Sequence, residues 1–228
     1  MIRGKQFYTK DKKLIDITNW DTSGNALDLG NRYGWEGAMA WGNLIHDELN
    51  ENGISIQPGD VYLDLGANIG MSAINAELKG ASKIYCVEPD PGVFEPLQMN
   101  KNDNWELFNI AISDYNGEMD IQKWPNWWET QPRPCFTLDS FFENNNIPHI
   151  DYMKVDIEGY EKSIFKNTKQ TTWDKIQKMF IEYHEDTSLS LDERAIERDN
   201  FARFINNKGF KQFKMVLGDH QSFLYFWK

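Results

Sequence analysis

The chain has 228 residues, of which 40% are hydrophobic and 26% are charged. This length suits one domain with a sizeable core and is too short for two ordinary domains. No apolar run approaches the roughly 20 residues of a membrane helix, and the N-terminal segment lacks the apolar stretch of a signal peptide. The formal net charge of −11 disfavours a nucleic-acid partner, because phosphate binding requires clustered lysine and arginine.

The chain contains only two cysteines, Cys86 and Cys135. Two such residues make neither a disulfide framework nor a CxxC metal site. We therefore expect a reducing, cytoplasmic location. Cys86 lies inside an apolar run, which predicts a buried thiol.

The chain is predicted to form one globular unit with two parts. Residues 1–55 are polar and aromatic with weak periodicity, and we expect them to form an extension that packs on the catalytic domain. Within this extension, residues 35–49 have apolar positions spaced as in a helix. Residues 56–228 are predicted to form the catalytic domain itself.

Strand and helix patterns alternate from residue 56 onward. Short apolar runs predict strands over 61–66, 83–89, 105–113, 151–159 and 178–185. Helical patterns cover 71–80, 91–102, 137–145, 160–170 and 190–209, and two final strands meet at Gly218-Asp219. This alternation predicts an α/β fold with a doubly wound, mostly parallel sheet and a C-terminal antiparallel hairpin. Ligands of such sheets bind beyond the carboxyl ends of the strands.

A glycine-containing loop follows the first strand of this alternation. It reads Asp64-Leu65-Gly66-Ala67-Asn68-Ile69-Gly70, and its glycines allow a sharp turn and a close approach of ligand to backbone. The next strand ends at Glu88. An acid about 20 residues after a glycine loop can accept hydrogen bonds from a ribose diol. The two features together predict an adenosine site.

The loop residues favour one adenosine ligand over another. Asn68 stands where the dinucleotide fingerprint has its second glycine, so a diphosphate fits poorly and a nicotinamide oxidoreductase is disfavoured. Asp64 adds a negative charge just before the loop. A carboxylate suits a ligand with an ammonium group and a sulfonium, and S-adenosylmethionine has both.

Six motifs occur in one order between about residues 58 and 185: DLGANIG, VEPDP, NIAISD, TLDSFF, KVDIEGYE and IEYHE. In this order they resemble the FkbM family of S-adenosylmethionine-dependent methyltransferases. The resemblance implies the class I methyltransferase, Rossmann-like fold. It also implies S-adenosylmethionine as donor, S-adenosylhomocysteine as product and a hydroxyl acceptor, often on a sugar or a secondary metabolite.

The resemblance also implies a set of donor-binding residues. They are Asp64, Gly66, Ala67, Asn68, Gly70, Ser72, Glu88, Asn109, Ala111 and Glu36. Among them, Ser72 is expected to reach the donor carboxylate and Glu88 to hold the ribose hydroxyls. Asn109 and Ala111 are expected near the adenine, and Glu36 is expected to close the pocket from the N-terminal side.

Two strand ends supply the predicted catalytic residues, Asp156 and His184. Methyl transfer needs the acceptor, methyl and sulfur held in line, and an alcohol acceptor benefits from a base. His184 has a suitable unperturbed pKa and is the predicted base, with Asp156 as the other candidate or as a positioning group. Glu182 is predicted to contact the acceptor, and a structural role in pinning a loop is the alternative.

The same region offers a metal-binding alternative. Asp156, Glu158, Glu182 and His184 could together bind Mg²⁺, which prefers oxygen ligands. Their spacing is not diagnostic, so no resident metal is predicted. Glu158 and Glu161 are instead expected to interact with the dipole of the helix that follows them.

A tryptophan-rich stretch, KWPNWWETQPRPC, covers residues 123–135. Its prolines predict neither helix nor strand. Trp124, Trp127 and Trp128 are predicted to contact the acceptor, because indole rings pack well against the C–H faces of sugars. The alternative is that they cover the sheet edge or form an oligomer interface, such as that of a homodimer.

The sequence thus predicts methyl transfer from S-adenosylmethionine to a hydroxyl of a sugar, glycan or other small molecule. No nucleic-acid or membrane partner is expected. A non-catalytic protein that binds adenosylmethionine or acts in assembly is one alternative, and methylation of a peptide is another.

Overall fold

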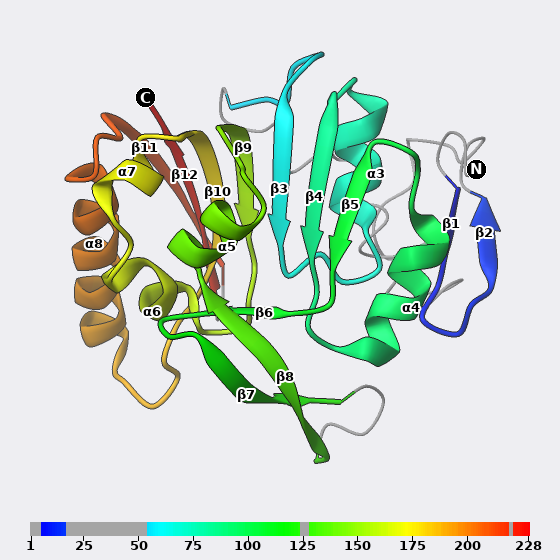
Figure 1. The fold of residues 1–228 in the computed structure, drawn as a ribbon. Coiled ribbons are helices and arrows are strands. Elements are labelled where there is room, and N and C mark those ends of the chain that lie inside the picture. The colour runs from blue at the N-terminus through cyan, green and yellow to red at the C-terminus, as the bar shows by residue number, and fades with distance from the viewer. Residues whose placement is uncertain (1–5, 17–53, 124–127, 219–220) are drawn as a thin grey trace.

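The computed structural model describes residues 6–16, 54–123, 128–218 and 221–228. Its centre is a seven-stranded sheet (Figure 1) with the order β11 (Gln212–Leu217), β12 (Gln221–Trp227), β10 (Ile176–His184), β9 (Ile150–Val155), β3 (Val61–Leu65), β4 (Lys83–Val87) and β5 (Trp105–Phe108). Neighbouring strands are parallel except for β12, which is antiparallel to β10 and β11. The predicted doubly wound sheet is confirmed, with the antiparallel strand one place inside the edge.

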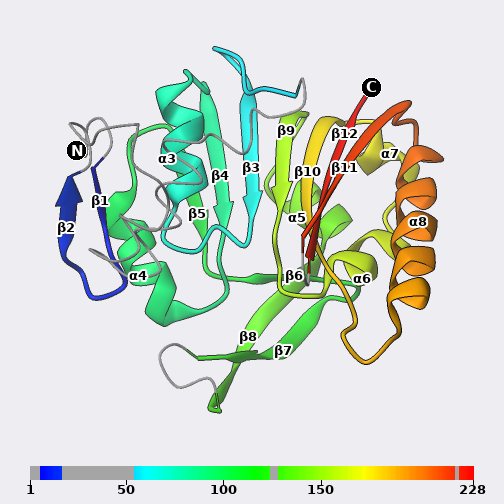
Figure 2. The same ribbon diagram turned by 180° about the vertical axis from the view of Figure 1, so that it is seen from behind.

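Six described helices cover the two faces of this sheet (Figure 2). They are α3 (Met71–Leu78), α4 (Pro91–Asn100), α5 (Leu138–Asn144), α6 (Glu161–Lys166), α7 (Gln170–Trp173) and α8 (Leu191–Asn206). Side chains alternate along each strand, so Leu63 packs with α5 to α8 while Tyr62 packs with α3 and α4. Cys86 is fully buried on the Tyr62 side, as predicted.

Helix starts follow from local capping. The Thr137 side chain accepts a hydrogen bond from the Ser140 N–H, as its predicted N-cap role requires. Ser190 and Glu193 form a capping box at the start of α8. The described ranges contain no helix that is long and apolar enough to cross a membrane.

The strand predicted over 105–113 is wrong as a single element. The chain leaves the main sheet after Phe108, and β6 (Ala111–Ser113) pairs in a second sheet of order β6-β8-β7. The Asn109 side chain donates hydrogen bonds to the carbonyls of Glu88 at 2.8 Å and Pro89 at 3.1 Å, which holds the chain at this point. An apolar run shows burial but not which sheet each half joins.

The stretch 123–135 was predicted to contain no strand, and this is also wrong. After β7 (Gly117–Gln122), residues Thr130–Thr137 form β8, despite Pro132 and Pro134. Before Cys135, β8 is paired along one edge only, with β7, and β6 joins the other edge at Cys135. The open edge has no neighbouring strand, so the missing N–H groups of the prolines cost no hydrogen bond there. Strands β7 and β8 form an arm that projects from the end of the main sheet at which the parallel strands have their carboxyl ends (Figure 1).

A two-stranded N-terminal hairpin, β1 (Gln6–Tyr8) and β2 (Leu14–Asp16), lies beside α4 (Figures 1 and 2). Phe7 is fully buried in the apolar cluster that includes α3 and α4. The helix predicted over 35–49 lies outside the described residues. The division of the chain into an extension and a catalytic domain stays a prediction.

Candidate active site

A cavity of about 530 Å³ lies at the carboxyl ends of β3, β4 and β9, where the strand order reverses. Its volume is typical of small-molecule sites. Five of the predicted site residues line it: Gly66, Asn68, Glu88, Ala111 and Asp156. Glu158, named above as a possible metal ligand, also lines it. The sequence did not point to several further contributors, which include Lys10 from the N-terminal hairpin, Met119 to Gln122 from the arm, and Tyr160.

The glycine loop brings two strand ends into close contact. Gly66 has a φ of 80°, and a Cβ there would lie 1.7 Å from the Asp156 carbonyl oxygen. Gly70 has a φ of 90°, and a Cβ there would lie 2.8 Å from Leu97. Asn68 also has a positive φ of 51°. The glycines therefore let the loop turn tightly, so its backbone forms part of the cavity wall.

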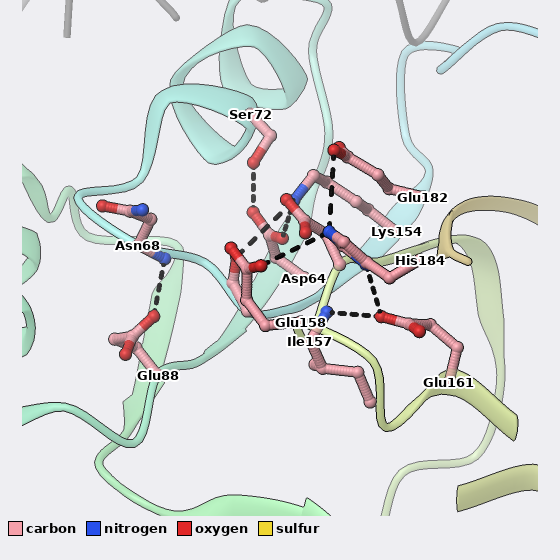
Figure 3. Close-up of polar contacts among 12 residues, drawn as sticks. Asp64, Asn68, Ser72, Glu88, Lys154, Ile157, Glu158, Glu161, Glu182 and His184 are labelled. Carbon is pink, nitrogen blue, oxygen red and sulfur yellow. Dashed lines mark hydrogen bonds and ion pairs between the residues drawn. The ribbon is translucent and has the colours of Figure 1, made fainter. Parts of the chain in front are cut away.

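Glu88 connects the ends of β3 and β4 (Figure 3). Its carboxylate accepts hydrogen bonds from the backbone N–H of Asn68 and of Asp90, both at 2.9 Å. Burial raises the pKa of Glu88 to about 7, although these two N–H groups favour the ionised form. Glu88 is thus fixed at the cavity wall near its titration point at neutral pH.

Asp64 lies fully buried beneath the loop (Figure 3). The Ser72 hydroxyl donates a hydrogen bond to its carboxylate, so the structure places Ser72 against Asp64 rather than in the cavity wall. Burial raises the pKa of Asp64, and the nearby Lys154 opposes this shift. Direct contact of Ser72 with a donor carboxylate stays a prediction.

Lys154 is the centre of a buried charge cluster that the sequence analysis missed. Its Nζ lies 3.0 Å from Asp156 Oδ2 and 3.6 Å from Asp64 Oδ1. Burial disfavours its charge, but Asp156 and Asp64 outweigh this and raise the pKa of Lys154. A lysine inside the apolar run of β9 is itself a signal, because buried lysines are almost always paired.

His184 lies among three carboxylates (Figure 3). Its Nδ1 is 3.0 Å from Glu161, and its Nε2 is 3.3 Å from Glu158 and 4.0 Å from Glu182. Burial lowers the pKa of His184, but Glu161 and the other acids outweigh it and raise the pKa to about 9. The imidazole is therefore protonated at neutral pH in this arrangement, and it can act as a base only after it loses that proton.

Glu161 also organises the loop after β9. It is almost fully buried, and its Oε1 accepts hydrogen bonds from the backbone N–H of Ile157 at 3.2 Å and of Gly159 at 3.1 Å. Single ligand atoms of Asp156, Glu158 and His184 lie within 4.8 Å of one another, as a cation site would require. A metal would have to displace the proton of His184 first.

The remaining predicted residues differ in position. Ala67 and Gly70 belong to the loop but do not line the cavity, and Asn109 holds the β4–α4 connection. Trp128 is 81% exposed beside the arm. Glu36, Trp124 and Trp127 lie outside the described residues. The site roles of all these residues stay predictions.

The residues present fit S-adenosylmethionine. A Cβ at Gly66 would overlap the Asp156 carbonyl oxygen, so glycine is needed for the loop to lie against the end of β9, where its backbone lines the cavity. Glu88 offers a carboxylate to a ribose, while Asp156 and Glu158 put negative charge elsewhere in the same cavity, where a sulfonium is favoured. The cavity therefore has an acceptor for a diol and acidic groups for a cation.

Comparison with known proteins agrees with this fit. The sequence model of the methyltransferase FkbM domain matches residues 64–211. Among curated relatives, the 2-O-methyltransferase NoeI of Sinorhizobium fredii is 26% identical over 157 residues, covering 56% of this chain and 64% of that protein. The 31-O-demethyl-FK506 methyltransferase FkbM of Streptomyces tacrolimicus is 21% identical over 179 residues, covering 59% and 69%.

A solved structure supports the fold. The methyltransferase FkbM of Methylobacillus flagellatus superposes with a TM-score of 0.56 at 16% identity, covering 78% of this chain and 46% of that one. This chain therefore matches only part of the length of each relative. Because the family pattern covers more than half of the chain, the chain belongs to the methyltransferase FkbM domain family, and this membership implies S-adenosylmethionine as cofactor.

Proposed function

We propose that this chain transfers a methyl group from S-adenosylmethionine to a hydroxyl of a sugar, glycan or other small molecule. The observation that carries the proposal is one cavity that joins Glu88 and the Gly66 loop to Asp156. It provides a place for an adenosine and, at the end of β9, a place for a reacting group. The names of two relatives, a 2-O-methyltransferase and a 31-O-demethyl-FK506 methyltransferase, support oxygen as the acceptor atom.

In this proposal the donor lies along the carboxyl ends of β3 and β4. Glu88 accepts hydrogen bonds from the ribose hydroxyls, and the backbone at Gly66 and Asn68 surrounds the methionine portion. Ile112 and Ile121 supply apolar surface for the adenine, and both line the cavity. The bound donor supplies an activated methyl on a sulfonium. The protein holds the acceptor oxygen in line with that methyl, which is the main contribution of positioning.

Asp156 and His184 are assigned to the acceptor. Asp156 lines the cavity, whereas His184 does not line it and lies with its Nε2 3.3 Å from the cavity-lining Glu158. We infer that neutral His184 takes the acceptor proton and that Asp156, fixed by Lys154, positions the acceptor. Glu182, 4.0 Å from His184, orients the imidazole or the acceptor. Since the pKa of His184 is about 9, this assignment requires activity to rise toward alkaline pH.

Calorimetry tests the donor assignment. We expect S-adenosylhomocysteine to bind with a Kd near 1 μM, about −8 kcal/mol, and NAD not to compete. Replacing Glu88 with alanine should weaken binding by about 2 kcal/mol, roughly 30-fold, the scale of hydrogen bonds to a charged group. The matched control is Glu106→Ala, at an exposed position on β5. Binding of NAD without binding of S-adenosylhomocysteine would refute the proposal.

A methyl-transfer assay with a panel of sugars, phenols, peptides and small alcohols tests turnover. Transfer to an oxygen atom supports the proposal. Transfer to a peptide, or donor binding without turnover on any acceptor, would favour the peptide or non-catalytic alternative instead.

A further inference from the structure

The N-terminal hairpin contributes a charged residue to the cavity. Lys10 follows β1, is only 9% exposed, and lines the cavity together with Glu88 and Asp90. Among the described residues that line this cavity, Lys10 is the only one with a basic side chain. It also lies outside residues 64–211, the region that matches the family. Family membership therefore assigns no role to it.

Hydrogen bonds from one side chain of α4 hold the N-terminal hairpin against the glycine loop. The buried Asn100 side chain accepts a hydrogen bond from the Tyr8 N–H at 2.5 Å and donates to the Tyr8 carbonyl at 3.0 Å. The same amide donates to the Ile69 carbonyl at 2.7 Å. One side chain of α4 thus connects the hairpin to the glycine loop, so the position of Lys10 is coupled to that of the cavity wall.

The turn after β1 fixes the backbone around Lys10. The Thr9 N–H donates to the Lys13 carbonyl at 2.9 Å, and the Lys12 N–H donates to the Thr9 carbonyl at 2.8 Å. The Thr9 hydroxyl accepts from the Lys13 N–H at 3.1 Å. Lys12 points elsewhere, to an exposed ion pair with Glu95 at 2.7 Å. The turn therefore separates two lysines, one at the cavity and one at the surface.

Acidic groups that line the cavity with Glu88 oppose its ionisation, and a nearby cation favours it. Burial raises the pKa of Glu88 to about 7, and the charge of Asp90 adds to this, while Lys10 lowers it. The other charged groups that line the cavity are Asp120 on β7 and Asp156 and Glu158 after β9, all acidic. Each of these acids disfavours a further negative charge in the cavity. A protonated carboxyl would accept hydrogen bonds from a ribose diol only weakly.

We propose that Lys10 is a positioning residue of the donor site, whose ammonium group favours the ionised form of Glu88, the form whose carboxylate accepts hydrogen bonds from the donor ribose. This inference rests on the proposed donor site. It makes the N-terminal hairpin a functional part of the enzyme, because it supplies a charge that the family-matched region lacks at this wall.

The test measures S-adenosylhomocysteine binding by calorimetry between pH 6 and pH 9 for the wild-type chain and three variants. In Lys10→Met the loss of the cation raises the pKa of Glu88, so binding should be about fivefold weaker at neutral pH and close to wild type at pH 9. Lys10→Arg keeps the charge and should retain wild-type binding at neutral pH. Lys12→Met removes a lysine from the same turn but away from the cavity, and should match wild type at every pH.

The shape of the pH profile decides the result. Weakening of Lys10→Met by the same factor at every pH would overturn the proposal, because it would indicate direct contact with the donor. An unchanged profile would overturn it as well. Failure of the wild-type chain to bind S-adenosylhomocysteine would refute the proposed function itself, which is a different result from loss of the pH effect alone. Circular dichroism of each variant checks that the fold is retained.

Discussion

Replacing Lys154 with methionine tests whether the buried charge cluster stabilises the fold. The substitution keeps the length of the side chain but removes the only cation within reach of Asp64 among the ion pairs of the described residues, at 3.6 Å. Asp64 is fully buried and Lys154 nearly so, whereas the Asp156 side chain is 26% exposed. Most of the cost should therefore come from Asp64, because solvent can partly stabilise Asp156.

The expected magnitude follows from this geometry. Removing one partner of a buried ion pair costs about 3–5 kcal/mol. For a chain of this length each kcal/mol lowers the melting temperature by roughly 2–4 °C, so Lys154→Met should lower it by roughly 6–20 °C. The pKa of Asp64 is already raised by burial and should rise further without Lys154. With a raised pKa, Asp64 binds its proton more tightly in the folded chain than in the unfolded chain, so lower pH stabilises the folded variant. The loss of stability caused by Lys154→Met should therefore be smaller at pH 5 than at pH 8.

Thermal and urea unfolding at both pH values measure the effect. Asp64→Asn in the Lys154→Met background should recover part of the lost stability, because it removes the unpaired charge. Lys83→Met is the control, since Lys83 and Glu106 form an exposed pair worth less than about 1 kcal/mol. If Lys154→Met stayed within about 1 kcal/mol of wild type at pH 8, the cluster would not stabilise the fold as argued.

Three further predictions concern the loop and the acceptor side. Gly66→Ala should abolish donor binding and lower the free energy of unfolding by at least about 3 kcal/mol, because its Cβ would overlap the Asp156 carbonyl. The control Gly59→Ala, with a φ of 93° and open space around it, should lower it by only about 1–2 kcal/mol, and equal losses would contradict the overlap argument. The kcat/KM of the wild type should rise with a midpoint near pH 9, the pKa of His184 in the free protein, and His184→Asn should lower kcat by about 100-fold or more with donor affinity retained. A pH-independent kcat/KM in the wild type would exclude His184 as the base. EDTA should leave activity unchanged, and loss of activity restored by Mg²⁺ would instead assign a cation to Asp156, Glu158 and His184.

The parts of the site that sequence predicts best are the ones fixed by local backbone geometry. Gly66, Gly70 and Glu88 follow from a strand, a turn and the next strand, all within about 25 residues of chain. The positive φ values and close contacts of Gly66 and Gly70 show why glycine is needed at both positions. Asp156 is predictable for the same reason, because parallel strands place their carboxyl ends at one edge.

The parts that the sequence did not predict depend on contacts between distant segments. Lys10 reaches the cavity only because Asn100 holds the hairpin beside Ile69. The arm contributes Met119 to Gln122 only because the chain leaves the main sheet at Asn109. Neither contact produces a periodic pattern, so hydrophobic spacing could not reveal them. Pro132 and Pro134 led to the wrong prediction that their stretch contains no strand, because an edge strand accepts prolines that a central strand does not.

His184 illustrates how a residue at a predicted strand end can have an unexpected chemical state. Its position at the end of β10 follows from the sequence, and its ordinary pKa makes it a natural base. Its pKa in the folded chain depends on acids from the segment after β9, with Glu161 first and then Asp156 and Glu158. The sum of these charges emerges only after folding, and it holds the imidazole protonated at neutral pH. A bound donor would add a positive charge to the cavity that Asp156 and Glu158 line, and Glu158 lies 3.3 Å from His184 Nε2. This charge should lower the pKa of His184 and bring it closer to the range that a base requires.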